Sequence, residues 1–503
     1  MTLLTTLFFG SVIGAVLIGL WFVAKPYLYV QFYKKQGAQG YFKPFGGFFM
    51  DRMTEARQNN DFFAYFKEVI FQKPDTQVIV SNVASKPVLF LVQPDMIKEF
   101  LNQPQLYRKT KFISGVEGLF EGQGILFTEG NQWKKQRRLL TATFQNELLK
   151  EQIPLMAKIT EKVYDTIGTT PETKDLNRIN IMKLNQRIAG DIIGEFYFGS
   201  SYGKHTFEGQ SLTMGLRKLL KDGFKQMYTV WNWLFGAWFI RSGILPQHKQ
   251  LMERIRSLRV TLLNIILEAK RRKNVPEEEN SLIQNLLELQ KQSPENALTD
   301  DEIADNFISL FLAATDTTGN LVSMIFYYLS KNPEIFEKTF NEIQDIVKSK
   351  TELSFEDLHK MDYTMAVIKE TLRVANPQGL LVFREAIEDH ELKGLQIKRG
   401  TLITFSPLLN GFNEKYFTDI DKFDPSRWLV KREKSIHPFA FIPFSAGPRS
   451  CPGQHLTFIE AKIMLSCFLM KYKMSVSNDY TLKMTNRGTY EPLQNIRMSL
   501  IEN

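Results

Sequence analysis

The chain has 503 residues, 44% of them apolar and 23% charged, which is the ordinary composition of a globular protein and excludes disordered, collagen-like and disulfide-scaffold proteins. Its 63 Lys and Arg against 54 Asp and Glu leave a formal net charge of +9, which is modest for this length. That charge fits an acidic partner or an anionic membrane surface and does not by itself indicate nucleic acid. With only two cysteines, Cys451 and Cys467, a reducing compartment is favoured.

The N-terminus carries an uncharged segment, residues 3–24, which at ~1.5 Å per residue is long enough to cross a ~30 Å hydrocarbon core. Trp21 lies near its end, and lysines follow the segment while none precedes it, so the positive-inside rule predicts that the rest of the chain is cytosolic. A cleaved signal peptide is the alternative, but the segment lacks a basic start and a clear A-x-A site. We expect a transmembrane anchor over 1–25, a Pro/Gly linker over 26–50 on which the body pivots, and one large domain over 51–503.

The body alternates between short strand patterns and long helical ones. Two β-rich runs within residues 75–93, separated by a Ser-Lys-Pro break, predict a hairpin. Amphipathic helical patterns dominate from about 131 to 375, and strand-like pieces return near 394–405. We therefore predict a mainly α protein with a minor β part and without internal repeats.

The longest helical pattern begins at Thr299, where Glu302 completes a capping box, and runs to Leu329 before an Asn-Pro pair ends it. About 30 residues of helix measure ~45 Å, enough to cross the body. A polar cluster with an acid, residues 313–318, lies at its centre, where burial makes polar groups costly. Either the cluster serves chemistry, or Thr hydroxyls bond backward and bend the helix.

The most specific pattern is the cysteine loop at residues 444–453, where Gly447 and Gly453 flank Cys451 at positions −4 and +2. Glycine permits tight turns and close approach of another group to the backbone. A helix-like run follows directly, and we expect its first amides to face the sulfur and favour the thiolate. Arg449 adds positive charge for an anionic ligand group. A single Cys in this setting suits a thiolate ligand to a metal-bearing cofactor, whereas structural zinc requires four ligands.

The cysteine loop resembles the haem-binding loop F-x-x-G-x-R-x-C-x-G of the cytochrome P-450 superfamily, the haem-thiolate monooxygenases. Four further features resemble that family and occur in the family's order along the chain. Trp133 and Arg137 resemble the W-x-x-x-R of an early helix, and residues 313–318 resemble the oxygen-binding motif of the central helix. Residues 370–373 resemble the E-x-x-R pair, and residues 423–428 resemble the meander motif. The resemblance covers roughly residues 40–500. It implies the cytochrome P-450 fold, with a long central helix over haem and small β sheets.

The resemblance implies haem b (iron protoporphyrin IX) as the cofactor, with Cys451 as the axial ligand of its iron. Phe444 and Gly453 belong to the same cofactor-binding loop. The implied partners of the haem propionates, which suit the planar guanidinium fork, are Trp133, Arg137, Arg384 and Arg449. The implied structural network, which locks the core behind the haem, consists of Glu370, Arg373 and Arg427.

Asp316 and Thr317 resemble the family's acid–alcohol pair, which delivers protons to bound dioxygen. The chain departs from the family in having Ala314 where Gly is common and Thr457 where many members carry Ala. Family topology and apolar content also suggest walls for an apolar substrate pocket, against the alternative of plain core packing. These are 112–127, Phe307, Leu310, Phe311, Ala314 and 379–382.

The implied activity is insertion of one oxygen atom from O2 into an apolar substrate: a lipid, sterol, fatty acid or xenobiotic. The chain has no P-loop and no Rossmann fingerprint, so electrons are expected from a partner, an NADPH-dependent flavin reductase, with cytochrome b5 as a further candidate. A haem-thiolate peroxide isomerase or dehydratase is the alternative, but such members often lose the acid–Thr pair; a non-catalytic haem sensor or carrier has no need of the pair at all. The expected location is the endoplasmic reticulum membrane, single-pass, with no nucleic-acid partner.

A second membrane contact is predicted in the stretch 227–240, which is uncharged and holds Trp231, Trp233 and Trp238, three of the six tryptophans. Fourteen residues are too few to span a bilayer but enough to lie in its interface, where Trp is favoured. The alternative is a buried lid that packs on the protein itself.

Overall fold

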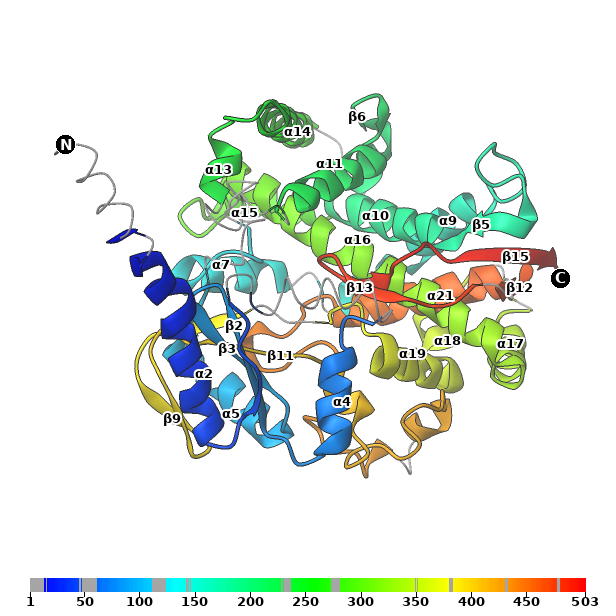
Figure 1. Ribbon diagram of the computed structural model, residues 1–503. Coiled ribbons are helices and arrows are strands. Elements are labelled where there is room, and N and C mark those ends of the chain that lie inside the picture. Colours follow the sequence, from blue (N-terminus) through cyan, green and yellow to red (C-terminus); the bar gives the residue numbers. More distant parts are fainter. Residues whose placement is uncertain are drawn as a thin grey trace.

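Helices dominate the computed structural model of the protein, and small sheets gather toward one side (Figure 1). The structure describes residues 13–14, 16–44, 47, 61–110, 124–141, 144, 146–227, 229, 237–272, 281–348, 350, 352–379, 383–429, 433–476 and 480–503. The α-helices are α2 (Lys25–Lys35), α4 (Ala64–Gln72), α5 (Pro94–Asn102), α7 (Gly130–Thr141), α8 (Asn146–Glu151), α9 (Ile153–Tyr164), α10 (Ile181–Phe198), α11 (Leu212–Met227), α13 (Ala237–Arg241), α14 (Pro246–Arg271), α15 (Leu282–Gln292), α16 (Asp300–Lys331), α17 (Pro333–Val347), α18 (Phe355–His359), α19 (Asp362–Ala375) and α21 (Gln454–Leu469). The mainly helical architecture expected from the sequence is confirmed.

The strands form one larger sheet and several small ones. They are β1 (Gln39–Gly40), β2 (Val78–Val83), β3 (Lys86–Leu91), β4 (Tyr107–Lys109), β5 (Ile179–Asn180), β6 (Thr206–Phe207), β7 (Gln210–Ser211), β8 (Arg384–Ala386), β9 (His390–Leu392), β10 (Leu395–Ile397), β11 (Leu402–Phe405), β12 (Tyr472–Val476), β13 (Met484–Asn486), β14 (Tyr490–Pro492) and β15 (Arg497–Glu502). The larger sheet has the order β1-β2-β3-β11-β8-β4. Its β2 and β3 pair antiparallel, which confirms the hairpin predicted within 75–93.

The central helix α16 matches its prediction at both ends. The Glu302 amide donates to Thr299 Oγ1 at 3.2 Å, and the Thr299 amide donates to Glu302 Oε2 at 3.0 Å, which completes the predicted capping box. The helix ends at Lys331, immediately before Asn332. It runs through the middle of the helical part (Figure 1) and packs against α10, α14, α19 and α21.

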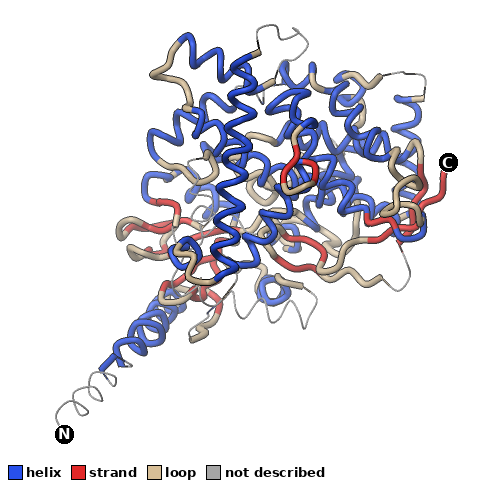
Figure 2. The backbone as a smooth tube through the Cα atoms, turned by 90° about the horizontal axis from the view of Figure 1, so that it is seen from above, coloured by secondary structure: helices blue, strands red, loops and turns tan. Residues whose placement is uncertain are grey.

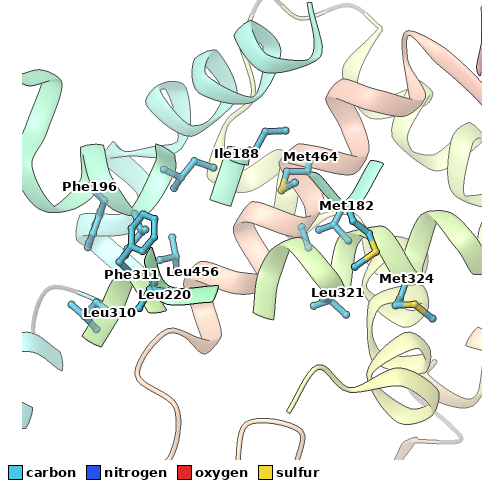
Figure 3. Close-up of a cluster of buried hydrophobic side chains, with 14 of the residues drawn as sticks. Met182, Ile188, Phe196, Leu220, Leu310, Phe311, Leu321, Met324, Leu456 and Met464 are labelled. Carbon is cyan, nitrogen blue, oxygen red and sulfur yellow. The ribbon is translucent and has the colours of Figure 1, made fainter. Parts of the chain in front are cut away.

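A buried apolar cluster holds α10, α16 and α21 together (Figure 3). Ile188 of α10, Leu310 and Phe311 of α16, and Leu456 and Met464 of α21 all belong to it. Each side chain of this size contributes ~1.5–3 kcal/mol when fully buried. Because α21 begins three positions after the cysteine, this packing fixes the cysteine loop relative to the centre of α16.

The expectation of a pivoting linker over 26–50 is wrong for its first part. Residues 25–35 form α2, in which Pro26 occupies the first turn, where its missing amide is no cost. Val30 and Tyr33 on one face of α2 are fully buried against the larger sheet. The Tyr33 hydroxyl also lies 2.7 Å from Thr401 Oγ1. Val30 and Tyr33 are three residues apart, so they lie on one face of α2, and this face packs against the larger sheet. Residues 25–35 are therefore part of the packed body and do not form a flexible linker.

The N-terminal helix leaves the body. It extends from Val16 through a π-helical turn into α2, and the Val16–Lys35 stretch is apolar and long enough to cross a membrane (Figure 2). Trp21 and its apolar neighbours are more than half exposed. The other helix that passes this test, α16, is mostly buried and is the core helix. The predicted anchor over 1–25 shares with this stretch the residues 16–24, which precede the part of α2 that packs on the body, while residues 1–12 and 15 of the anchor lie outside the described part.

Candidate active site

The cysteine loop folds around its own sulfur. The Cys451 amide donates to the Phe444 carbonyl at 2.9 Å, which closes the loop. Gly447 has φ +75°, a left-handed conformation that glycine adopts without strain. Gly453 precedes α21, and a Cβ placed on it would lie 3.9 Å from Cys451 Sγ. The ring of Phe444 packs edge-on against Phe458 of α21, with 5.2 Å between the centroids.

The Cys451 residue is exposed to solvent, yet the protein atoms packed around its sulfur raise the pKa of the thiol. A hydrogen bond from the Gly453 amide and the charge of Arg137 both lower that pKa, but burial outweighs them. The amide at the start of α21 therefore favours the thiolate, as expected, although burial outweighs this effect. A bound metal ion deprotonates a coordinating thiol outright.

Three arginines from separate elements lie near Cys451 or near one another: Arg137 of α7, Arg384 of β8 and Arg449 of the cysteine loop. Burial and the charge of Arg449 lower the pKa of Arg384 to about 10, and burial also lowers the pKa values of Arg137 and Arg449. Among the described residues none of the three forms an ion pair, and Glu129 attracts two of them electrostatically. The site thus carries a surplus of positive charge that suits an anionic ligand.

Trp133 lies within the same group of side chains. The guanidinium carbon of Arg449 lies 3.9 Å from the centroid of the Trp133 ring, a cation–π contact. Arg449 Nη1 also donates to the Thr128 carbonyl at 3.3 Å. These two contacts hold the guanidinium plane in place beside the cysteine loop.

The centre of α16 carries the predicted Asp316–Thr317 pair. Ala313 is exposed although the helix is buried on both sides of it, which places an accessible surface in the middle of the core. Thr317 Oγ1 donates back to the Ala313 carbonyl at 2.5 Å, the back-bonding that the sequence left open, yet the helix continues without a break. Asp316 is a quarter exposed, and its Oδ1 lies 3.6 Å from Arg217 Nη2 of α11 without a hydrogen-bond partner.

The residues suggested as walls of an apolar substrate pocket differ in how deeply they are buried. Phe307 and Phe311 are fully buried and pack on other aromatic rings, so for these two the alternative of core packing holds. Leu310 is also buried, whereas Ala314 is half-buried next to Ala313. A Cβ at Gly379 would meet Tyr490 at 2.8 Å, so that position is tightly packed. Residues 112–123 and 380–382 lie outside the described part of the chain.

The predicted network Glu370–Arg373–Arg427 is assembled as one buried unit. Glu370 Oε1 accepts from Arg373 Nη2 at 2.8 Å and from Arg427 Nε at 3.3 Å. Arg373 Nη1 donates to the carbonyls of Gly411 and Ile420, and Trp428 Nε1 donates to Glu370 Oε2 at 2.9 Å. The network binds α19 to the segment before the cysteine loop.

Three charged residues of this region escaped the sequence reasoning: Arg217 of α11, Glu460 of α21 and Glu491 of β14. Burial raises the pKa of Glu460 to about 8, and a side-chain hydrogen bond with Thr318 offsets only part of this rise. Its signal was available, because a Glu on an otherwise apolar helix nine positions after Cys451 is unusual. Arg217 and Glu491 gave no local signal, since only the fold brings them to Asp316.

The residues present fit a planar, dianionic, metal-bearing cofactor. A lone sulfur and a surplus of arginines lie near one another, and the described residues contain no cluster of three or more His, Cys, Asp or Glu that could hold a metal on its own. An axial thiolate and two carboxylates are the groups that such a donor set would hold.

A family model described as Cytochrome P450 matches residues 44–497. "Cytochrome P450 4c21" of Blattella germanica is 28% identical over 445 residues, 84% of each chain. "Cytochrome P450 4V2" of Homo sapiens is 26% identical over 78% of this chain and 75% of its own, and "Abscisic acid 8'-hydroxylase 2" of Arabidopsis thaliana is 29% identical over 80% and 78%. Among solved structures, "Crystal structure of cytochrome P450DA heme domain" shares the fold with a TM-score of 0.75 at 17% identity, covering 88% of this chain and 93% of that one.

Proposed function

The chain belongs to the cytochrome P450 family and is a haem-thiolate monooxygenase, and from this premise we propose that it inserts one oxygen atom from O2 into a lipophilic substrate such as a lipid, sterol, fatty acid or xenobiotic. The observation that carries the proposal is the loop around Cys451, which brings the sulfur near Arg137 and holds Arg449 against the Trp133 ring. Relatives named abscisic acid 8'-hydroxylases make lipophilic acids one class to include in a substrate screen.

In this proposal Cys451 is the axial ligand of the haem iron, and Arg137, Arg384, Arg449 and Trp133 hold the propionates. Haem supplies, when bound, the redox chemistry that activates dioxygen, and a thiolate ligand favours O–O cleavage. The arginines would bind the propionates bidentately, because their planar forks match carboxylates. Their surplus charge would be neutralised by that contact, which would remove the mutual repulsion of Arg384 and Arg449.

Asp316 and Thr317 are proposed to move the protons that the reaction consumes. Thr317 has a hydroxyl at the accessible centre of α16, and the neighbouring carboxyl has an oxygen without a hydrogen-bond partner. A peroxide isomerase or a haem sensor would need no such pair. In this proposal the two side chains themselves hold and pass on the proton.

We further propose that electrons come from an NADPH-dependent flavin reductase, with cytochrome b5 as a second donor, at the endoplasmic reticulum membrane. Support comes from the apolar helix Val16–Lys35 and the lysines Lys34 and Lys35 at its end, which favour an anchored body in the cytosol. A body that stands on the membrane would receive its lipophilic substrate from lipid.

The experiment uses full-length protein in nanodiscs with reductase and NADPH. Asp316→Asn and Thr317→Ala should keep haem and substrate binding, while product formed per NADPH falls by about 10-fold or more and peroxide rises, because proton transfer by a positioned group contributes ~10²–10⁴-fold. Asp345→Asn, an exposed acid paired with Lys348, serves as the control and should stay coupled. Conversion of a hydroperoxide without NADPH, and no NADPH-dependent product, would instead identify the isomerase alternative.

A further inference from the structure

A buried polar cluster lies beside Asp316, on the side of α16 that faces α11. Arg217 of α11 is buried, and its Nη2 donates to Gln186 Oε1 of α10 while lying 3.6 Å from Asp316 Oδ1. An Arg–carboxylate pair at 3.6 Å is looser than the 2.7–2.9 Å of a charge-assisted hydrogen bond. Arg217 Nε and Asp316 Oδ1 both lack hydrogen-bond partners. The Arg217 guanidinium and the Asp316 carboxylate therefore lie close together without a hydrogen bond between them.

The C-terminal hairpin β13–β14 adds a second carboxylate to this cluster. Asn320 Nδ2 donates to Glu491 Oε2 of β14 at 3.2 Å and to Thr489 Oγ1 at 3.1 Å. Asn320 lies four residues after Asp316, so both share one face of α16, separated by one helical turn. Gln186 Nε2 donates to Asn320 Oδ1 at 2.7 Å and thereby links the two ends of the cluster.

The cluster contains positively and negatively charged side chains that act on one another electrostatically. Arg217 and Lys221, four residues apart on α11, face Asp316 and Glu491, and Asp191 of α10 contributes a weaker attraction to Arg217. Burial and the negative charge of Asp316 raise the pKa of Glu491. Lys221 is exposed, so the cluster reaches from solvent to the centre of α16. Arg217 thus lies 3.6 Å from the Asp316 carboxylate and is linked to the Glu491 carboxylate through Gln186 and Asn320.

We propose that Glu491 is a positioning residue for proton delivery: its carboxylate shares Arg217 and Lys221 with Asp316 and so keeps one oxygen of Asp316 open to take up a proton and pass it on. The proposal rests on the proposed function of the Asp316–Thr317 pair. Each reaction cycle consumes two protons, and for each of them Asp316 takes one proton from the solvent side of the cluster and gives one to the Thr317 hydroxyl side, so its own state is restored. Glu491 touches neither substrate nor cofactor and acts only through Arg217 and Asn320.

The test is Glu491→Gln, which keeps the size of the side chain and one acceptor oxygen for Asn320 but removes the charge. Arg217 then pairs with Asp316 alone, so Asp316 should hold its proton less tightly. Product per NADPH should fall about 3- to 10-fold at neutral pH, and the pH at which coupling is half-maximal should move toward acid. Glu491→Asp keeps the charge and should recover most of the coupling. Glu502→Gln, at an exposed position of β15, is the matched control.

A second readout separates this proposal from the function on which it rests. The infrared carboxyl band that disappears in Asp316→Asn can be titrated in the full-length protein without turnover, and in Glu491→Gln it should titrate at lower pH than in the unmodified protein. An unshifted titration, or a loss of coupling equal at every pH, would reduce Glu491 to a structural brace and overturn the proposal. If the unmodified protein forms no product but the band still shifts, the proposed function fails while the link between Glu491 and Asp316 stands.

Discussion

Replacement of Glu370 by Gln tests the buried charge network most directly. The Glu370 carboxylate is fully buried on α19 and accepts five hydrogen bonds: two from Arg373 and one each from Arg427, Trp428 and the Asp424 amide. It is also the anion that compensates two buried guanidinium groups. An amide has one acceptor oxygen and no charge, so part of these donors would lose their acceptor and both cations their counter-charge.

The expected loss of stability follows from that inventory. Removing one partner of a buried ion pair costs ~3–5 kcal/mol, because the remaining charge stays buried and uncompensated. Arg373 retains its bonds to the carbonyls of Gly411, Ile420 and Lys422, which keeps the expected value within this range. The free energy of unfolding of Glu370→Gln should therefore fall by about 4 kcal/mol.

The assay is urea unfolding followed by circular dichroism and Trp fluorescence, with Glu433→Gln as the matched control. Glu433 pairs with Lys369, the residue before Glu370, at 2.6 Å but in a partly exposed position, where an ion pair contributes ~0–1 kcal/mol. The control midpoint should stay close to that of the unmodified protein. Equal midpoints for the two variants would refute the reasoning, because burial would then make no difference to the value of the charge.

The remaining predictions concern the ligand, the membrane and the buried acid. Cys451→Ser should abolish the carbon monoxide absorption band typical of thiolate-ligated haem, and Cys467→Ser, in a buried position of α21, should retain it. A protein without residues 1–25 should still bind liposomes, and Trp238→Ser, at a residue that is 65% exposed, should weaken that binding. The control Ile501→Ser, at a residue that is 70% exposed near the C-terminal end, should not weaken it. If the truncated protein does not bind liposomes, the anchor is the only membrane contact. The pKa of Glu460 is about 8 in the folded protein and 4.5 in the unfolded chain, so between these values the folded protein keeps a proton that the unfolded chain releases. The free energy of unfolding should therefore fall as pH rises from about 5 to 8, and Glu460→Gln should reduce this dependence on pH. Parallel pH curves for the two proteins would contradict the prediction.

A large part of what was predicted depends only on residues that lie close together in the sequence. The capping box of Thr299 and Glu302, the antiparallel pairing of β2 and β3, and the left-handed turn at Gly447 all follow from local hydrogen bonding and φ preferences. The motifs around Cys451 were readable for the same reason, since their residue types sit at fixed short spacings. The N-terminal apolar segment was visible because its composition alone sets it apart.

Tertiary structure decided whatever depends on burial and on contacts between distant segments. Residues 25–35 contain Pro and follow an apolar run, and only docking of Val30 and Tyr33 on the sheet made them a packed helix. For the Cys451 thiol, the local amide lowers the pKa but desolvation outweighs it, and desolvation is a property of the whole fold. Asn320 and Glu491 are 171 positions apart, so no spacing in the sequence could show that β14 brings a second carboxylate to the acid of α16.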